Sequence, residues 1–259
     1  MDAQEFYDGL GPDYDLMVSW PQRLAREEAF FQRTFSEAGV RRVLDAACAT
    51  GVHAVSFARS GLACAAADVS SVMVETARRK ARSAGVEVDF QVAGFGGLTE
   101  RFGAGFDAVT CIGNSLPHLL DDESLSTALS DFAHTLRPGG ILIVQNRNYD
   151  RVLRERQRLM PPVSRGDGEG EAIFLRITEF APSGSGDEER IRFTILTLRR
   201  RGESWSLTER TTPLRALRRE TLESALRRAG FATVRVYGGY GREPFDAPGT
   251  GDLVIVAAR

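Results

Sequence analysis

Apolar runs of strand length alternate with amphipathic runs of helical length from residue 42 to residue 146. A helical stretch at about 20–38 precedes them. The periodicity predicts strands at 42–47, 62–68, 86–92, 106–112 and 141–146, with helices at 52–60, 70–84 and 121–136. Strands that alternate with helices in this way indicate a parallel sheet covered by helices.

Residues that begin and end helices stand at the expected places. Ser70 and Asp121 are well placed to cap the starts of helices, and Gly61 and Gly85 fall where helices should stop. The segment RPGG at 137–140 is predicted to form a turn that ends one helix before the next strand. These signals agree with the periodicity.

The pattern changes past Tyr149. Segment 151–170 is rich in arginine and then in proline and glycine, which is typical of a short helix followed by a loop. Three strand-like runs follow at 171–180, 190–200 and 204–212. Turns at Pro182–Gly184 and at Arg201 and Gly202 predict that these three strands are antiparallel.

The first pattern returns at the end of the chain, with a helix at 219–229 and strands at 231–237 and 251–258. The predicted fold class is therefore α/β: a doubly wound, seven-stranded, mostly parallel sheet with an inserted three-stranded antiparallel sheet. We expect a helical lid at 1–40, a sheet domain at 41–150 and 215–259, and a substrate cover at 151–214. Such an insertion would lie above the C-terminal edge of the sheet, where these folds bind ligands.

The charge balance limits the class of partner. A formal net charge of -2 gives no general attraction to nucleic acid or to anionic lipid, so a small-molecule substrate is favoured. The three cysteines lie in apolar runs and are expected to be reduced thiols. With no targeting segment and no membrane span recognised, we expect a cytoplasmic protein. The sequence leaves open whether it acts as a homo-oligomer.

The segment VLDAACATG at 43–51 predicts a strand, a tight turn and the start of a helix. Backbone N–H groups at such a turn can approach a ligand closely, and an acid at the end of the next strand, here Asp68, can bind ribose hydroxyls. A pyrophosphate needs several glycines in the turn, but Gly51 is the only one present. Asp45 favours a cationic ligand. S-adenosylmethionine, which has a ribose, an ammonium and a sulfonium but no phosphate, fits this turn.

The chain then shows a resemblance to a known family. VLDAACATG followed by Asp68 resembles the first motifs of the Rossmann-like S-adenosylmethionine-dependent methyltransferases. CIGNSLPHL at 111–119 and RNYD at 147–150 are similar to segments of the glycine and sarcosine N-methyltransferase family. The similarity covers roughly residues 5–150.

The resemblance implies a site for S-adenosylmethionine, which leaves as S-adenosylhomocysteine. It implies that Ala47 and Val52 contact the methionine portion of the cofactor and that Asp68 binds the ribose. It also implies that Arg23 binds the methionine carboxylate, with Arg26 as the alternative residue. Further cofactor-site residues are Tyr14 and Tyr7 on the lid, Asp45 and Gly51 at the turn, Met73, Gly94 and Phe95 around the adenine, and Ile112, Gly113, Asn114 and Ser115 at the seam with the acceptor.

The same resemblance implies N-methylation of a small amine, with glycine and sarcosine as the leading acceptors. Arg147 would hold the acceptor carboxylate through a two-pronged hydrogen bond, Asn114 would orient the amine, and His118 is a candidate proton acceptor. His53 and His134 are expected to be structural, and no set of metal ligands emerges. Methyl transfer needs mainly positioning, because an in-line displacement requires a nucleophile held close to the methyl carbon.

Two departures from the family pattern stand out. Ala49 replaces a usual glycine, which adds a methyl group where a positive φ would favour glycine. Gly94 stands where an Asp or Asn usually accepts a hydrogen bond from the adenine amino group. Three alternatives stay open: a methyltransferase of a larger secondary metabolite, a non-catalytic S-adenosylmethionine-binding protein, and an NAD-dependent oxidoreductase, which the missing glycines disfavour.

Overall fold

The computed structural model describes residues 1–11, 13–166, 170–181 and 189–259. Its main sheet has seven strands in the order β10-β11-β5-β4-β1-β2-β3. The bounds are Arg42–Ala46 for β1, Ala63–Asp68 for β2, Asp89–Val92 for β3, Phe106–Cys111 for β4, Leu136–Arg147 for β5, Thr233–Tyr237 for β10 and Asp252–Ala258 for β11. Strands β1 to β5 pair in parallel, and β11 is antiparallel to both β5 and β10. The predicted fold class is confirmed.

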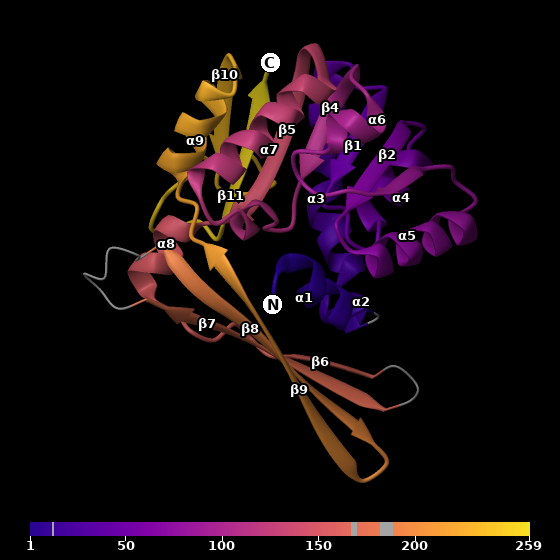
Figure 1. Cartoon of the computed structure of the whole chain (residues 1–259), viewed down its shortest axis with the longest axis vertical. Coiled ribbons are helices and arrows are strands. Elements are labelled where there is room, and N and C mark those ends of the chain that lie inside the picture. The colour runs from indigo at the N-terminus through magenta and orange to yellow at the C-terminus, as the bar shows by residue number, and fades with distance from the viewer. Residues whose placement is uncertain (12, 167–169, 182–188) are drawn as a thin grey trace.

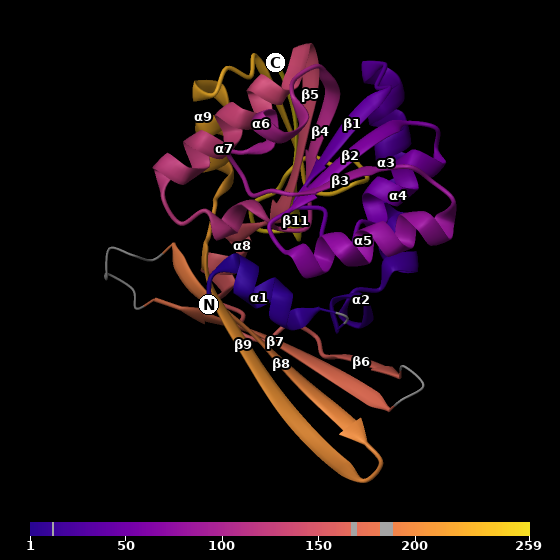
Figure 2. The same ribbon diagram turned by 45° about the vertical axis from the view of Figure 1, so that its right-hand side comes forward.

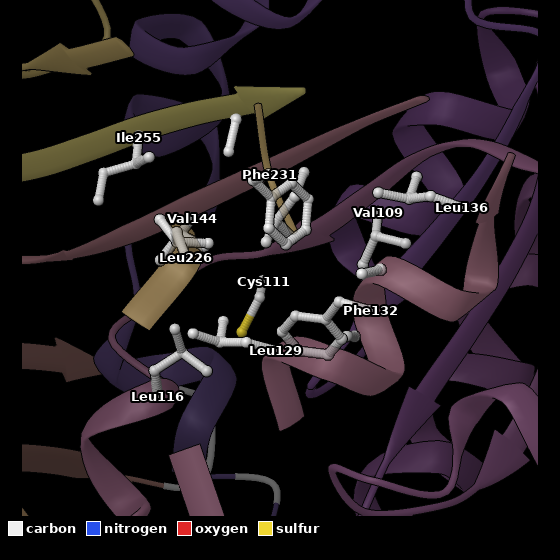
Figure 3. Close-up of a cluster of buried hydrophobic side chains, with 14 of the residues drawn as sticks. Val109, Cys111, Leu116, Leu129, Phe132, Leu136, Val144, Leu226, Phe231 and Ile255 are labelled. Atoms are coloured by element: carbon white, nitrogen blue, oxygen red, sulfur yellow. The ribbon is translucent and has the colours of Figure 1, made fainter. Parts of the chain in front are cut away.

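Helices cover both faces of this sheet (Figures 1 and 2). One face carries α3 (Trp20–Ala38), α4 (Val52–Arg59) and α5 (Ser71–Ala84); the other carries α6 (Leu98–Phe102), α7 (Asp122–Thr135) and α9 (Arg219–Arg228). Figure 3 shows the second layer, where Leu129 and Phe132 of α7 and Leu226 of α9 pack against β-strand side chains such as Val109. Burying a side chain of this size contributes about 1.5–3 kcal/mol, so the layer holds the helices firmly on the sheet.

Local capping follows the sequence. The Ser70 side chain accepts a hydrogen bond from the Met73 N–H and the Asp121 side chain accepts one from the Ser124 N–H, so both residues cap the helices that they precede. Gly85 ends α5 in the left-handed conformation that glycine adopts without a steric cost.

Several predicted bounds were wrong. The RPGG segment lies inside β5, which begins at Leu136, and its pairing with β4 shifts register between Phe106 and Ala108. Residues 137–140 include the extra residues of β5 at this shift. The segment that was predicted to be a turn therefore forms a β-bulge within the strand. Strand β3 begins only at Asp89. The short helices α1 (Ala3–Leu10), α2 (Asp13–Met17) and α6 were not predicted individually, although Ala3, Phe6, Tyr7 and Leu10 of α1 recur at helical spacing.

The inserted sheet has four strands rather than the expected three, in the order β6-β7-β8-β9. Its antiparallel strands are β6 (Val163–Gly166), β7 (Glu171–Phe180), β8 (Arg190–Arg201) and β9 (Ser204–Arg215), and β6 follows the short helix α8 (Tyr149–Glu155). Strand β6 is short and mostly exposed, so its sequence shows no apolar alternation. The turn at Gly202 is present, with a φ of 60°. The turn predicted at Pro182–Gly184 lies outside the described residues.

The N-terminal helices α1 and α2 lie between the two sheets, below the C-terminal ends of the parallel strands (Figure 1). Phe6 and Leu10 of α1 pack with Met73 of α5 and with Phe174 and Ile195 of the inserted sheet. This shared apolar cluster fixes α1 over the edge of the main sheet.

Polar contacts add to the anchoring of these helices. Ser70 Oγ donates to Asp8 Oδ1 at 2.5 Å, and Thr50 Oγ1 and Trp20 Nε1 each donate to Asp15 Oδ1 at 2.7 Å. Lys80 Nζ lies 2.7 Å from Asp15 Oδ2. Within the described ranges, no helix is long and apolar enough to cross a membrane.

Candidate functional site

A cavity of about 210 Å³ lies at the C-terminal ends of β1, β2 and β4, next to α1. Asp68 lines this cavity, whose walls combine residues of five segments, at 3–14, 47–49, 68–69, 93–98 and 112–119. Residues expected at a cofactor site that line this cavity are Tyr7, Tyr14, Ala47, Asp68, Gly94, Phe95, Ile112, Gly113 and Ser115. The fold therefore brings most of the predicted set together.

The turn after β1 is held in an unusual conformation. Ala47 and Ala49 both have positive φ angles, 58° and 49°, and both line the cavity. An L-residue in this region costs about 1–2 kcal/mol, so the turn stores backbone strain at the cavity wall. Gly51, with a φ of 74°, packs so tightly that an added Cβ would lie 2.5 Å from the Ala77 Cβ. This position admits only glycine.

Asp68 joins the end of β2 to the strained turn. Its carboxylate accepts hydrogen bonds from the Ala49 N–H at 2.8 Å and the Ser70 N–H at 3.0 Å. Burial raises the pKa of Asp68 from 3.8 to about 6, although these two hydrogen bonds oppose the change. A carboxylate held at a cavity wall with further lone pairs available is suited to accept hydrogen bonds from a pair of hydroxyl groups.

Six predicted cofactor residues do not line this cavity: Arg23 and Asn114 line a second cavity, described below, and the other four line neither. Asp45 is buried, its Oδ1 accepts from Thr110 Oγ1 at 2.7 Å, and burial raises its pKa. Met73 lies in the apolar cluster under α1, and Gly51 and Val52 form the start of α4. Asp45 in β1 and the Gly51–Val52 start of α4 flank the turn, whereas Met73 packs against α1.

A second cavity of about 580 Å³ adjoins the first. Tyr7, Tyr14, Gly113 and His118 line both, so the two cavities meet at these residues. The second cavity is also lined by three predicted site residues, which are Arg23, Asn114 and Arg147, and by side chains of the inserted sheet, including Arg176 and Phe193.

Arg23 is oriented by a buried acid. Its Nε donates to Glu27 Oε1 at 2.9 Å, and the Glu27 side chain is only 1% exposed. The His53 Nε2 lies 2.6 Å from Glu27 Oε2, which gives His53 the structural position that was expected. Although burial opposes it, the hydrogen bonds from His53 and Arg23 lower the pKa of Glu27. Glu27 therefore stays ionised and holds the Arg23 guanidinium at the cavity wall.

Asn114 links the ends of β4 and β5. Its Oδ1 accepts from the Arg147 N–H at 3.0 Å, and its Nδ2 donates to the Tyr149 hydroxyl at 3.0 Å. That this side chain orients an amine stays a prediction. Because Oδ1 already accepts one hydrogen bond, only its second lone pair could accept another from an amine. Its observed contacts fix the backbone from which Arg147 projects.

His118 and Tyr7 form a contact that sequence reasoning did not anticipate. The Tyr7 hydroxyl lies 3.2 Å from His118 Nε2, and the two rings meet edge to face. Burial lowers the pKa of His118 to about 4 and raises the pKa of Tyr7. Both side chains are therefore uncharged at neutral pH, so the junction of the two cavities is polar but carries no charge.

Arg176 was missed as a site residue. It lies on β7 in line with Ala172 and Phe174, which face α1, because alternate residues of a strand share one face. A charged residue that interrupts an otherwise apolar face is the signal that could have identified it.

Comparisons with known proteins agree with this arrangement. Residues 43–140 match a protein family described as "Methyltransferase domain". The glycine/sarcosine N-methyltransferase of Aphanothece halophytica is 34% identical over 151 residues, which cover 58% of this chain and 57% of that protein. The chain thus matches little more than half the length of this relative.

Two solved structures show the same fold. An S-adenosylmethionine-dependent methyltransferase from Clostridium acetobutylicum superposes with a TM-score of 0.75 at 19% identity, over 98% of this chain and 96% of the other. CalS10 of Micromonospora echinaspora, an amino pentose methyltransferase solved with its S-adenosylmethionine bound, gives a TM-score of 0.71 at 19% identity, over 93% and 92%. The expected resemblance to the S-adenosylmethionine-dependent methyltransferases is confirmed.

Proposed function

We propose that this chain, whose residues 43–140 match a methyltransferase domain, is an S-adenosylmethionine-dependent N-methyltransferase that acts on a small amino acid. The observation that carries the proposal is the pair of adjoining cavities, with Asp68 in one and Arg147 in the other. Glycine and sarcosine are the first acceptors to assay, because the relative in Aphanothece halophytica is named for them.

The first cavity suits the cofactor. Asp68 would accept hydrogen bonds from the ribose hydroxyls, while Ala93, Phe95 and Leu98 offer an apolar wall for the adenine ring. Arg23 would bind the methionine carboxylate from the adjoining wall. The missing glycines matter little for this ligand, because it has no pyrophosphate to bring close to the backbone. When bound, S-adenosylmethionine supplies a methyl group attached to a positively charged sulfur.

The second cavity suits the acceptor. Arg147 would hold a carboxylate of the acceptor, which leaves the amine near Tyr7, Gly113 and His118, where the cavities meet. A His118 with a pKa of about 4 is neutral but a weak base, so we propose that it positions the Tyr7 hydroxyl rather than deprotonates an ammonium. The acceptor would then enter as the free amine.

We also propose that residues 1–40 act as a lid over the site and residues 151–214 as its cover, with 41–150 and 215–259 as the cofactor-binding domain. Residues of α1 and of β7 both line the second cavity, which supports this division. Because these segments would exclude water from the site, the hydrogen bonds and ion pairs that hold both ligands would be stronger.

A larger amine is the second candidate. A cavity of about 580 Å³ is large for glycine, and lining residues such as Met160 and Leu214 give it apolar walls. The amino sugar that CalS10 is named for is an acceptor of this larger class.

One assay separates these candidates. The protein is incubated with methyl-labelled S-adenosylmethionine and with glycine, sarcosine, other amino acids or amino sugars, and products are detected by mass spectrometry. Label in an amino acid supports the first candidate, and label only in an amino sugar supports the second. Binding of S-adenosylhomocysteine without transfer to any amine would refute both and favour a non-catalytic binding protein.

A further inference from the structure

The second cavity carries an excess of positive charge. Five arginines line it, and no aspartate or glutamate does so among the described residues. The five are Arg23, Arg26, Arg147, Arg165 and Arg176. A cavity that holds several guanidinium groups without counter-ions is unfavourable unless a ligand supplies negative charge.

Three of these arginines are accounted for without a ligand. Arg23 is hydrogen-bonded to the buried Glu27. Arg26 is 59% exposed and lies 3.6 Å from Glu27 and 3.7 Å from Asp252. Arg165 lies exposed on β6, where its Nη1 donates to the Ser164 carbonyl. None of these three arginines therefore requires a negatively charged acceptor as its partner.

Arg147 and Arg176 differ from the other three. Neither has an acidic partner within the part of the chain that the structure describes. Arg176 Nη2 donates to the Pro161 carbonyl at 3.2 Å, and its Nε is buried with no hydrogen-bond partner among those residues. Asp252, the cross-strand neighbour of Arg147, accepts instead from Gln145 Nε2 at 2.9 Å.

The two arginines reach the cavity from different parts of the fold. Arg147 ends β5 of the main sheet, whereas Arg176 lies on β7 of the inserted sheet, opposite Ile195. The C-terminal ends of the parallel strands face that inserted sheet, as Figure 1 shows. Burial, together with the Arg147 charge, lowers the pKa of Arg176, so the two cations already destabilise each other in the ligand-free protein.

We infer that the methyl acceptor is an amino dicarboxylate: Arg147 binds one carboxylate and Arg176 binds the second. The inference rests on the proposed function and narrows its substrate class. One carboxylate lies at the main sheet and the other at the cover, so the acceptor spans the cavity between the two arginines. Each guanidinium can form two parallel hydrogen bonds to its carboxylate, which satisfies the donors that now lack partners. Glycine and sarcosine, with one carboxylate each, would leave Arg176 unpaired.

The test compares acceptors that are nearly identical in shape. Calorimetry measures binding of glutamate against glutamine, and of aspartate against asparagine, to the protein saturated with S-adenosylhomocysteine. We expect each dicarboxylate to bind about tenfold to a hundredfold more tightly than its amide, the range of one charged hydrogen-bonded pair. In Arg176→Gln this preference should disappear while binding of S-adenosylhomocysteine is kept.

Arg192→Gln is the matched control. It removes one arginine from the neighbouring strand β8, where Arg192 is exposed and lies 3.7 Å from Glu179, outside the cavity lining. The preference should survive in this variant. Equal binding of acid and amide by the unmodified protein would overturn the inference, whatever the variants do. Tighter binding of O-phosphoserine than of either dicarboxylate would overturn the assignment of the second group as a carboxylate.

The two proposals can fail separately. A dicarboxylate preference in binding, without methyl transfer to any amino acid, would support the paired-arginine site and refute the proposed reaction. Methylation of glycine with no preference for dicarboxylates would support the reaction and refute the inference.

Discussion

Replacing Asp68 by asparagine should change how the stability of the ligand-free protein depends on pH. Burial raises the pKa of Asp68 from 3.8 to about 6, so the folded state binds a proton more tightly than the unfolded chain does. The stability from this carboxyl is fully present below about pH 4 and is lost as the pH rises through about 6. At 1.36 kcal/mol for each pKa unit, the loss is about 3 kcal/mol.

Asparagine cannot ionise, so Asp68→Asn should escape this loss. The variant also loses one of the hydrogen bonds from the Ala49 and Ser70 N–H groups, because its amide NH₂ cannot accept, but that cost does not depend on pH. The difference in unfolding free energy between variant and parent should therefore move in the variant's favour by about 3 kcal/mol from pH 4 to pH 8.

Urea unfolding of both proteins at intervals over this range measures that difference. Asp107→Asn serves as a control whose difference from the parent should stay nearly constant from pH 4 to pH 8. Although burial opposes it, the hydrogen bonds from Arg137 Nε at 2.5 Å and from two backbone N–H groups lower the pKa of Asp107. Its stabilising effect is present above about pH 4 and is lost as the pH falls. A difference for Asp68→Asn that stays constant with pH would refute the assignment of a destabilising buried carboxylate.

Three further substitutions test the second cavity and the turn after β1. Arg147→Lys should raise the acceptor KM about tenfold, since a lysine loses the two-pronged contact, with cofactor affinity unchanged in calorimetry; equal loss of both would contradict the acceptor role. Ala49→Gly should raise the unfolding free energy by about 1 kcal/mol, because glycine relieves the positive φ of 49°. A lower unfolding free energy for this variant in urea unfolding would show that Ala49 is not strained. Gly51→Ala should lower the unfolding free energy by about 3 kcal/mol, because the new Cβ would lie 2.5 Å from the Ala77 Cβ; a fully stable variant would show that the turn can relax.

The main sheet could be predicted because its signals are local. Strand-length apolar runs, helical periods and caps such as Ser70 and Asp121 act within a few residues, so the seven strands and most helices followed from sequence. Asp68 could be located for the same reason, because the end of the second strand can be recognised from neighbouring residues alone, whatever packs around it. The roles given to Asp68 and Arg147 stay predictions, although Asp68 lines the first cavity and Arg147 the second.

The acceptor side depended on contacts that no local pattern contains. Tyr7 meets His118 across 111 residues of chain, and Arg176 reaches the cavity only because the inserted sheet folds back under the main one. Met73 was predicted to touch adenine, yet α1 covers it, because burying its side chain against Phe6 and Leu10 is favourable.

The sequence by itself therefore determined the main sheet, the turn after β1 and the carboxylate at the end of β2, because each depends on short-range chemistry. Only the tertiary structure decided which arginines share a cavity and which of them lack counter-ions. Burial and charge pairing are properties of the packed chain, since both depend on residues that meet only after folding.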